Sequence, residues 1–122
     1  MTLRGKRPDL RALASVAAGH DCPVERTLAV VGAKWTLLIL HNLMDGAKRF
    51  GELERILTGA SPKMLTARLR ELERLGLATR TVYAEVPPRV EYELTEQGRS
   101  LRPIIDSLYR WGQQLKPAKR SV

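Results

Sequence analysis

Helical periodicity dominates the first two-thirds of the chain, and each apolar block is bounded by residues that begin or end helices. The first block begins at Pro23, with Asp21 or Cys22 as the candidate N-cap, and ends at Gly32. Proline suits the first helical position because its missing N–H has no intrahelical partner there. The second block, 34–44, is apolar nearly all round. That pattern is typical of a helix that is buried on most sides or lies in a subunit interface.

Two further helices, expected over 51–57 and 63–75, are separated only by the short region around the turn 58–60. Ser61 as N-cap and Pro62 at the first helical position are strong start signals for the second of them. Two helices joined by a tight, glycine-containing turn match the helix-turn-helix motif.

The second helix of this motif has one apolar and one polar face at about 100° per residue. Its polar face carries three cations and no acid, with Glu71 and Glu73 on the flanks. A helix in the major groove of DNA needs such donors for phosphates and base edges, and the free N–H groups of a helix N-terminus also suit a phosphate. The expected DNA contacts are Ser61, Pro62 and Ala67, with Lys63, Thr66 and Arg70 in the groove and Arg74 on the backbone.

A β-hairpin is predicted directly after the motif, with strands over 77–83 and 89–94. The second strand alternates apolar and charged residues, which indicates one buried face, and Pro87-Pro88 makes the connection a rigid loop. Together these elements predict a winged helix-turn-helix fold, mainly α with a small β-hairpin. The basic residues expected beside DNA are Arg80 and Arg89 on the hairpin and Lys48 and Arg49 in a short extended piece before the motif.

The last helix is expected to begin after Thr95 as N-cap, with a kink at Pro103. Its apolar residues recur at spacings of three and four, over a length greater than one small domain needs to cover. A subunit interface is the expected use of this stripe, which comprises Leu101, Ile104, Ile105, Leu108, Trp111 and Leu115.

Composition limits the chain to one domain and changes the weight of the charge argument. The chain has 122 residues, 43% of them hydrophobic, and a net charge of +8, which suggests a polyanionic partner. Residues 1–22 hold four basic and two acidic side chains, however, and residues 116–122 hold three basic and no acidic ones. We therefore expect a flexible basic arm over 1–21, a folded domain over 22–115 and a basic tail over 116–122, and we rest the DNA prediction on the motif.

Several classes of protein are excluded by what the sequence lacks. One cysteine and two histidines form neither an intrachain disulfide nor a four-ligand zinc site of nitrogen and sulfur ligands. No uncharged run approaches the roughly 18 residues of a membrane span. We expect no metal site, no cofactor, no catalytic residues and no membrane contact, and a cytoplasmic location by default.

Six ordered blocks carry a resemblance to a known family. They are Cys22-Pro23-Val24-Glu25, Gly32-x-Lys34-Trp35-Thr36, Arg49-Phe50-Gly51-Glu52-Leu53, Ser61-Pro62-Lys63-Met64-Leu65-Thr66-x-Arg68-Leu69-x-Glu71-Leu72, Val86-Pro87-Pro88-Arg89-Val90-Glu91-Tyr92 and Leu94-Thr95-x-x-Gly98. Over residues 22 to about 112, the chain resembles the HxlR-type bacterial transcriptional regulators. The resemblance implies a homodimer that binds double-stranded DNA and regulates nearby genes, and two-fold symmetry predicts a near-palindromic operator.

The resemblance also implies that the first and last helices of the domain make the dimer contacts. This adds Val24 and Leu28 to the expected interface. Trp35 is expected in the core or in that interface, although Trp35 and Trp111 could instead line a pocket for a small-molecule effector.

Cys22 is the candidate redox-sensing residue. Some members of the family sense oxidants or electrophiles through a cysteine at this position. The N-terminus of a helix favours a thiolate, while the neighbouring acids Asp21 and Glu25 oppose it.

Two other classes of function compete with a DNA-binding regulator. A winged-helix module for protein–protein interaction gives no reason for a cation-only helix face. A thiol enzyme using Cys22 needs a base or an arginine to activate the thiol, and the residues around position 22 supply no such arrangement. We therefore favour the regulator.

Overall fold

The computed structural model describes residues 2–4, 10–115 and 117. Most of the predicted basic tail 116–122 therefore lies outside the described residues, as do residues 1 and 5–9 of the predicted arm. In chain order the elements are β1 (Thr2–Arg4), α1 (Leu10–Ala17), α2 (Pro23–Val31), α3 (Lys34–Leu43), β2 (Lys48–Arg49), α4 (Phe50–Ile56), α5 (Pro62–Arg74), β3 (Ala78–Tyr83), β4 (Arg89–Leu94), α6 (Glu96–Arg99) and α7 (Arg102–Gln113).

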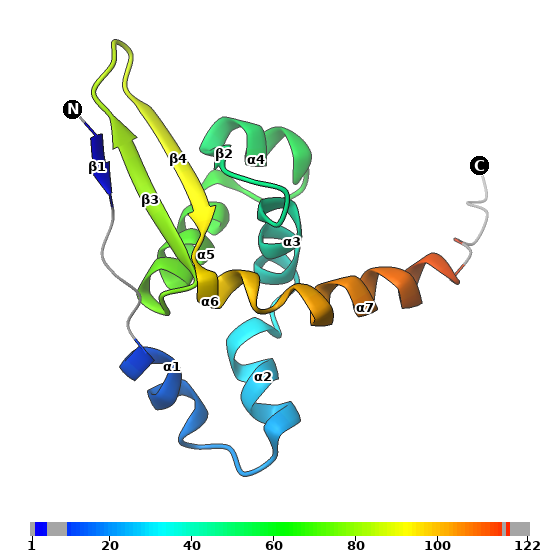
Figure 1. The fold of residues 1–122 in the computed structure, drawn as a ribbon. Coiled ribbons are helices and arrows are strands. Elements are labelled where there is room, and N and C mark those ends of the chain that lie inside the picture. Colours follow the sequence, from blue (N-terminus) through cyan, green and yellow to red (C-terminus); the bar gives the residue numbers. More distant parts are fainter. Residues whose placement is uncertain (1, 5–9, 116, 118–122) are drawn as a thin grey trace.

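The predicted helix-turn-helix and hairpin are both present. Helices α4 and α5 form the motif, and β3 and β4 pair antiparallel from Ala78 opposite Leu94 to Tyr83 opposite Arg89. Two short strands flank this hairpin, so that the sheet has the order β1-β3-β4-β2. The hairpin extends away from the helices at one end of the molecule, and α1 and α2 lie at the other end (Figure 1).

The core lies where α3, α4, α5 and the base of the hairpin meet. Leu65, Leu69 and Leu72 form the apolar face of α5 and have no exposed surface. Ile39 and Leu40 of α3 are equally buried and belong to the same cluster. Burying this face of α5 fixes which residues the helix presents to solvent.

Local signals set the ends of α5, and the signal at its start is the predicted one. The Ser61 hydroxyl accepts a hydrogen bond from the Met64 N–H at 3.0 Å, which is an N-cap. Gly76, just after the helix, has φ of +74°, and Gly59 in the preceding turn has φ of +104°. A Cβ atom on Gly59 would lie 3.6 Å from the ring of Trp35. Half-buried Trp35 therefore packs against the turn of the motif and against the core of its own subunit. Of the two predicted places for Trp35, the structure favours the core over the dimer interface.

The predicted arm contains more regular structure than the sequence indicated. β1 pairs with β3, and α1 is an eight-residue helix within the segment predicted as a flexible arm. Ala12, Leu13 and Val16 of α1 are partly buried against the core. Their spacing is helical, but the small alanine side chains gave little hydrophobic signal without the surface that receives them.

The predicted single C-terminal helix, kinked at Pro103, is wrong. The chain forms two helices, α6 and α7, which are interrupted at Ser100 and Leu101. Pro103 lies in the first turn of α7, where its missing N–H costs no helical hydrogen bond. The prolyl ring therefore begins a new helix instead of bending an existing one.

Helix α7 is anchored to the body at its start and then projects from it (Figure 1). The Arg102 guanidinium donates a hydrogen bond to the Met44 carbonyl at 2.8 Å. Ile105, predicted as an interface residue, is only 4% exposed and belongs to the core. That prediction is corrected, because Ile105 faces the body of its own subunit. No helix among the described residues has the length and apolar character needed to cross a membrane.

Candidate nucleic-acid interface

Helix α5 presents the predicted cationic face to solvent. Lys63, Ala67, Arg70 and Arg74 are exposed, and Thr66 is half-buried beside them. These positions lie opposite the buried leucines because they are about half a helical turn away. The two-faced character inferred from the sequence is therefore present in the structure.

The two arginines of this face, Arg70 and Arg74, differ in whether they form an ion pair. Arg74 forms a bidentate pair with Glu71, with Nη2–Oε1 and Nε–Oε2 distances of 2.6 and 3.0 Å. These hydrogen bonds lower the pKa of the Glu71 carboxyl below its ordinary value. Arg70 forms no ion pair within the part of the chain that the structure describes. Arg70 can therefore contact DNA without breaking an existing ion pair, whereas Arg74 cannot.

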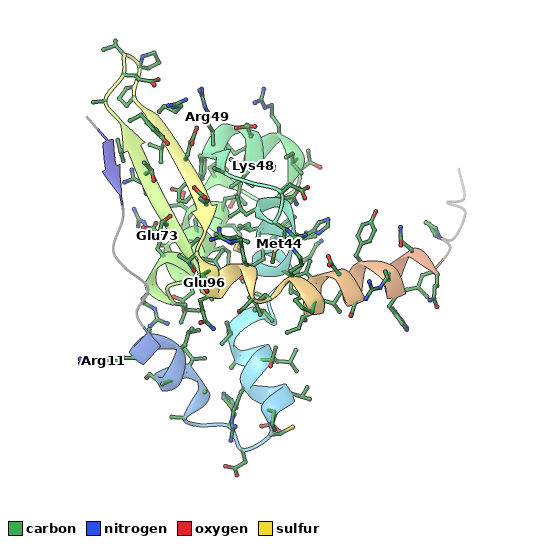
Figure 2. All side chains as sticks on the ribbon, in the orientation of Figure 1. Arg11, Met44, Lys48, Arg49, Glu73 and Glu96 are labelled. Carbon is green, nitrogen blue, oxygen red and sulfur yellow. The ribbon has the colours of Figure 1, made fainter. Side chains whose placement is uncertain are left out.

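Glu73 of α5 lies on the side of the helix next to the hairpin (Figure 2). Burial raises the pKa of its carboxyl, and the positive charges of Arg80 and Arg70 oppose that rise. The structure therefore brings Arg80 of β3 within electrostatic range of the same carboxylate as Arg70, so that predicted contacts on two elements are neighbours.

The N-terminus of α5 offers fewer donors than expected. Pro62 has no N–H, the Met64 N–H is used by the Ser61 hydroxyl, and the Leu65 N–H is bonded to the Ser61 carbonyl. Among the described residues, the Lys63 N–H is the donor of this turn that remains for an anion. The site can therefore position one phosphate oxygen, with the exposed Lys63 side chain nearby.

Lys48 and Arg49 lie on the other side of the hairpin from β1. They form β2, in which Lys48 pairs with Tyr92 and Arg49 with Glu91 of β4, and both lie beside α4 (Figure 2). The Arg49 N–H donates to the Glu52 carboxylate at 3.0 Å, which begins α4. The structure thus fixes the backbone of this piece and leaves the Arg49 side chain exposed.

Arg89, predicted to contact DNA from the wing, is held by its own hairpin. Its guanidinium lies 3.9 Å from the centre of the Tyr83 ring. It also pairs with Glu85 at 3.2 Å and with Glu91 at 3.7 Å, and its side chain is 27% exposed. Its Nε is buried without a hydrogen-bond partner in the described part of the chain.

The wing tip itself carries an apolar side chain. Val86 is fully exposed in the loop between the strands. Sequence reasoning missed both Val86 and the ring of Tyr83. The contact with the Tyr83 ring could have been found from the strand register, which places Tyr83 opposite Arg89.

Cys22 lies at the start of α2 with an exposed side chain. It occupies the N-cap position, although its side chain makes no capping hydrogen bond. The guanidinium of Arg26 donates to the carbonyls of His20 and Asp21 at 2.7 and 3.0 Å, which fixes the loop before the helix. The structure therefore presents the thiol on an anchored turn, open to solvent.

The predicted interface residues fall into two groups. Six of them are substantially exposed apolar side chains: Val24, Leu28, Ile104, Leu108, Trp111 and Leu115. Leu101 and Trp35 are half-buried and packed on the core, and Ile105 is buried. The exposed members on α7 share one stripe, which is the unpartnered apolar surface of that helix.

No cluster of three or more histidine, cysteine or acidic side chains suited to a metal occurs among the described residues. On α5 the described ion pair is the one between Arg74 and Glu71. The chemistry that this surface supports is recognition of an anionic polymer.

Comparison with known proteins agrees with this geometry. The family model for HxlR-like helix-turn-helix proteins matches residues 30–120. The HTH-type transcriptional regulator YdeP of Bacillus subtilis is 50% identical over 97 residues, which are 80% of this chain and 76% of YdeP. An HTH-type transcriptional regulator of Methanothermobacter thermautotrophicus is 52% identical over 91 residues, or 75% of this chain and 70% of the relative.

Solved structures show the same similarity. The redox regulator HypR in its oxidised form is 47% identical, with a TM-score of 0.76, and the match covers 80% of this chain and all of that one. The reduced form of the regulator YodB from B. subtilis is 38% identical, with a TM-score of 0.67, over 82% of this chain and all of YodB. The predicted winged fold and the predicted class of function, a DNA-binding transcription regulator, are confirmed. The chain belongs to the HxlR-like helix-turn-helix family.

Proposed function

We propose that the chain acts as a homodimer that places the α5 helix of each subunit in the major groove of a near-palindromic operator. The observation that carries this proposal is the exposed face of α5, which presents Lys63, Arg70 and Arg74. The acids Glu71 and Glu73 lie on the flanks of this face. Cations in this position suit phosphates and base edges. A protein-interaction module would have no use for such a face.

The test is a titration of DNA from upstream of the chain's own gene, followed by fluorescence anisotropy. We expect saturable binding that exceeds binding to random DNA, with a log–log salt slope on the order of −5 to −8 for two subunits. Lys63→Gln should reduce affinity and flatten the slope. Binding that is equal on random DNA and independent of salt would contradict the proposal.

Dimer formation through α2 and α7 is supported by their exposed apolar side chains. Leu108 and Trp111 on the projecting part of α7, and Leu115 just after the helix, are each more than half exposed. A second copy offers the same stripe in return. Two recognition helices should then protect half-sites about 34 Å apart. A footprint limited to one half-site would argue against a dimer on DNA.

An oxidant response through Cys22 is the finer part of the proposal. It is supported by the exposed thiol, by the similarity to the redox regulator HypR and by the similarity to the transcriptional regulator YodB, which has been solved in a reduced and in a diamide-treated form. An oxidant such as diamide accepts two electrons and two protons from two thiols, and a disulfide forms between two Cys22 residues or between Cys22 and a small thiol. Operator affinity should change with diamide in the wild type and stay constant in Cys22→Ser. An equal response of both proteins would assign the effect elsewhere.

A further inference from the structure

A cavity of about 350 Å³ lies between α3 and α7, and the predicted interface residues Ile105 and Leu108 form part of its wall. Its walls are apolar, formed by Leu37 and Leu38 of α3 and by Ile105 and Leu108 of α7. The two helices lie against each other here, and the Arg102 contact with the Met44 carbonyl holds α7 in place. This size and apolar character are typical of sites for small organic molecules.

The polar groups of the cavity indicate the charge of such a molecule. Lys34, in the first turn of α3, lines the cavity, and its Nζ lies 4.7 Å from the centre of the Trp35 ring. The N-terminus of α3 adds positive potential at the same place. No acidic side chain occurs among the described residues that line the cavity. An anion with an apolar body fits this charge distribution.

Aromatic rings from both helices contribute to the same cavity. His41 of α3 and Tyr109 of α7 stack with their ring centres 5.5 Å apart and their planes 25° from parallel. A flat ring can pack against leucine side chains and against this stacked pair. The cavity therefore suits a planar aromatic group, with a carboxylate directed to Lys34.

The position of the cavity would allow a bound molecule to affect DNA binding. Helix α3 packs against α5 as well as against α7. At about 100° per residue, Ile105 and Tyr109 occupy the α7 face next to the exposed stripe of Ile104 and Trp111, and Leu108 lies at the border. A molecule in the cavity would touch both the helix that supports α5 and the helix that carries the stripe.

We propose that this cavity is the effector site of the regulator and binds small aromatic carboxylates, with Lys34 as the counter-ion. This inference rests on the proposed function in one respect, since an effector acts by changing operator affinity. Occupancy fixes the position of α7 relative to α3, and in a dimer this position sets the spacing of the two α5 helices. A shift of that spacing changes the fit to two half-sites.

The experiment is isothermal titration of the full chain with 2-naphthoate, and with the neutral isostere 2-naphthamide, in the absence of DNA. We expect naphthoate to bind saturably, with one site per chain, and the amide to bind at least tenfold more weakly. Lys34→Gln should weaken naphthoate binding to the level of the amide, and Lys34→Arg should restore it. Arg55→Gln, which removes one exposed charge from α4, is the matched control and should bind like the wild type.

Several outcomes would overturn the site. The first is equal affinity for naphthoate and naphthamide. The second is unchanged naphthoate affinity in a Lys34→Gln variant that has a normal melting curve. The third is naphthoate binding that occurs only when Leu115→Asp makes the chain monomeric. The last result would mean that a second copy fills the cavity. A second titration measures operator affinity with saturating naphthoate, and an unchanged value would overturn the effector role. Loss of DNA binding with naphthoate binding intact would instead count against the proposed function.

Discussion

At the scale of single residues, the arginines of the candidate DNA surface differ in the ion pairs and ring contacts that they form within the subunit. Arg74 is bonded to Glu71 in the same helix, and Arg89 lies between Tyr83 and two carboxylates. Arg70 has an exposed side chain. The sequence predicted which residues face solvent on α5, because helical periodicity sets this. It did not predict which charges were already paired, because pairing depends on side-chain conformation and on strand register.

Arg70→Ala and Arg74→Ala should separate base reading from backbone contact. We expect Arg70→Ala to lower operator affinity by about 1–3 kcal/mol and to relax the preference at one position in each half-site. Arg74→Ala should weaken all sequences about equally. The measurement is anisotropy on the operator, on single-position variants of it and on random DNA. Identical losses on all three for Arg70→Ala would place Arg70 on the backbone.

Arg89→Met should test whether the wing arginine supports the hairpin or meets phosphate. Methionine keeps an apolar contact with the ring of Tyr83 but removes the charge. We expect DNA affinity to fall while the log–log salt slope stays constant, since the guanidinium is already neutralised by Glu85 and Glu91. Lys63→Gln, the comparison variant, should change the slope by about 1 per subunit. A similar change in Arg89→Met would show that Arg89 neutralises a phosphate.

At the scale of elements, the starts of helices were predictable and the division of the C-terminal region was not. Ser61 and Pro62 begin α5 through bonds to their immediate neighbours. The beginning of α6 also depends on distant residues, because the Thr95 hydroxyl donates to the Gly76 carbonyl at 2.6 Å. The N–H of Thr95 donates to the Leu77 carbonyl at 3.0 Å. Contacts across this separation leave no periodic pattern in the sequence.

Gly98→Ala should destabilise the fold because α6 is pressed against the α5–β3 turn. A Cβ atom at Gly98 would collide with the Leu77 carbonyl oxygen and lie 3.3 Å from Cβ of Leu94. We expect a loss of about 1–3 kcal/mol in the free energy of unfolding, as for overpacked sites. Urea denaturation at a fixed protein concentration measures it.

Gly112→Ala is the control for this substitution. Nothing lies within 4 Å of a Cβ atom at Gly112 in α7, and alanine favours a helix over glycine by roughly 0.5–1 kcal/mol. We therefore expect unchanged or increased stability. Equal destabilisation by both variants would mean that the contact with Leu77 is not the cause.

At the scale of the whole molecule, α7 has more apolar surface than one subunit can cover. Ile105 joins the core, while Leu108 and Trp111 on the projecting part and Leu115 just beyond the helix remain exposed. The sequence predicted the stripe, but it did not show where the subunit's own core ends, because a helix facing its own body and one facing a partner have the same periodicity.

Leu115→Asp should separate association from folding. Leu115 is 57% exposed, so a carboxylate there leaves the subunit's own core unchanged, but in a dimer it would be desolvated without a partner. We expect a monomer by sedimentation, a normal circular dichroism spectrum and weaker operator binding. A variant that stays dimeric would place the interface elsewhere.

The short strand β1 has a consequence for how the isolated protein should be prepared. It covers the outer side of β3 from Thr2 opposite Tyr83 to Arg4 opposite Thr81. Without it, the amide and carbonyl groups along that side of β3 would be available to any other extended chain, and exposed strand edges of this kind promote aggregation. Removal of residues 1–9 should therefore leave the helix-turn-helix folded but give concentration-dependent light scattering, which the full chain should not show at the same concentration. Truncation to the region shared with relatives would in this protein expose an unpaired strand edge that promotes aggregation.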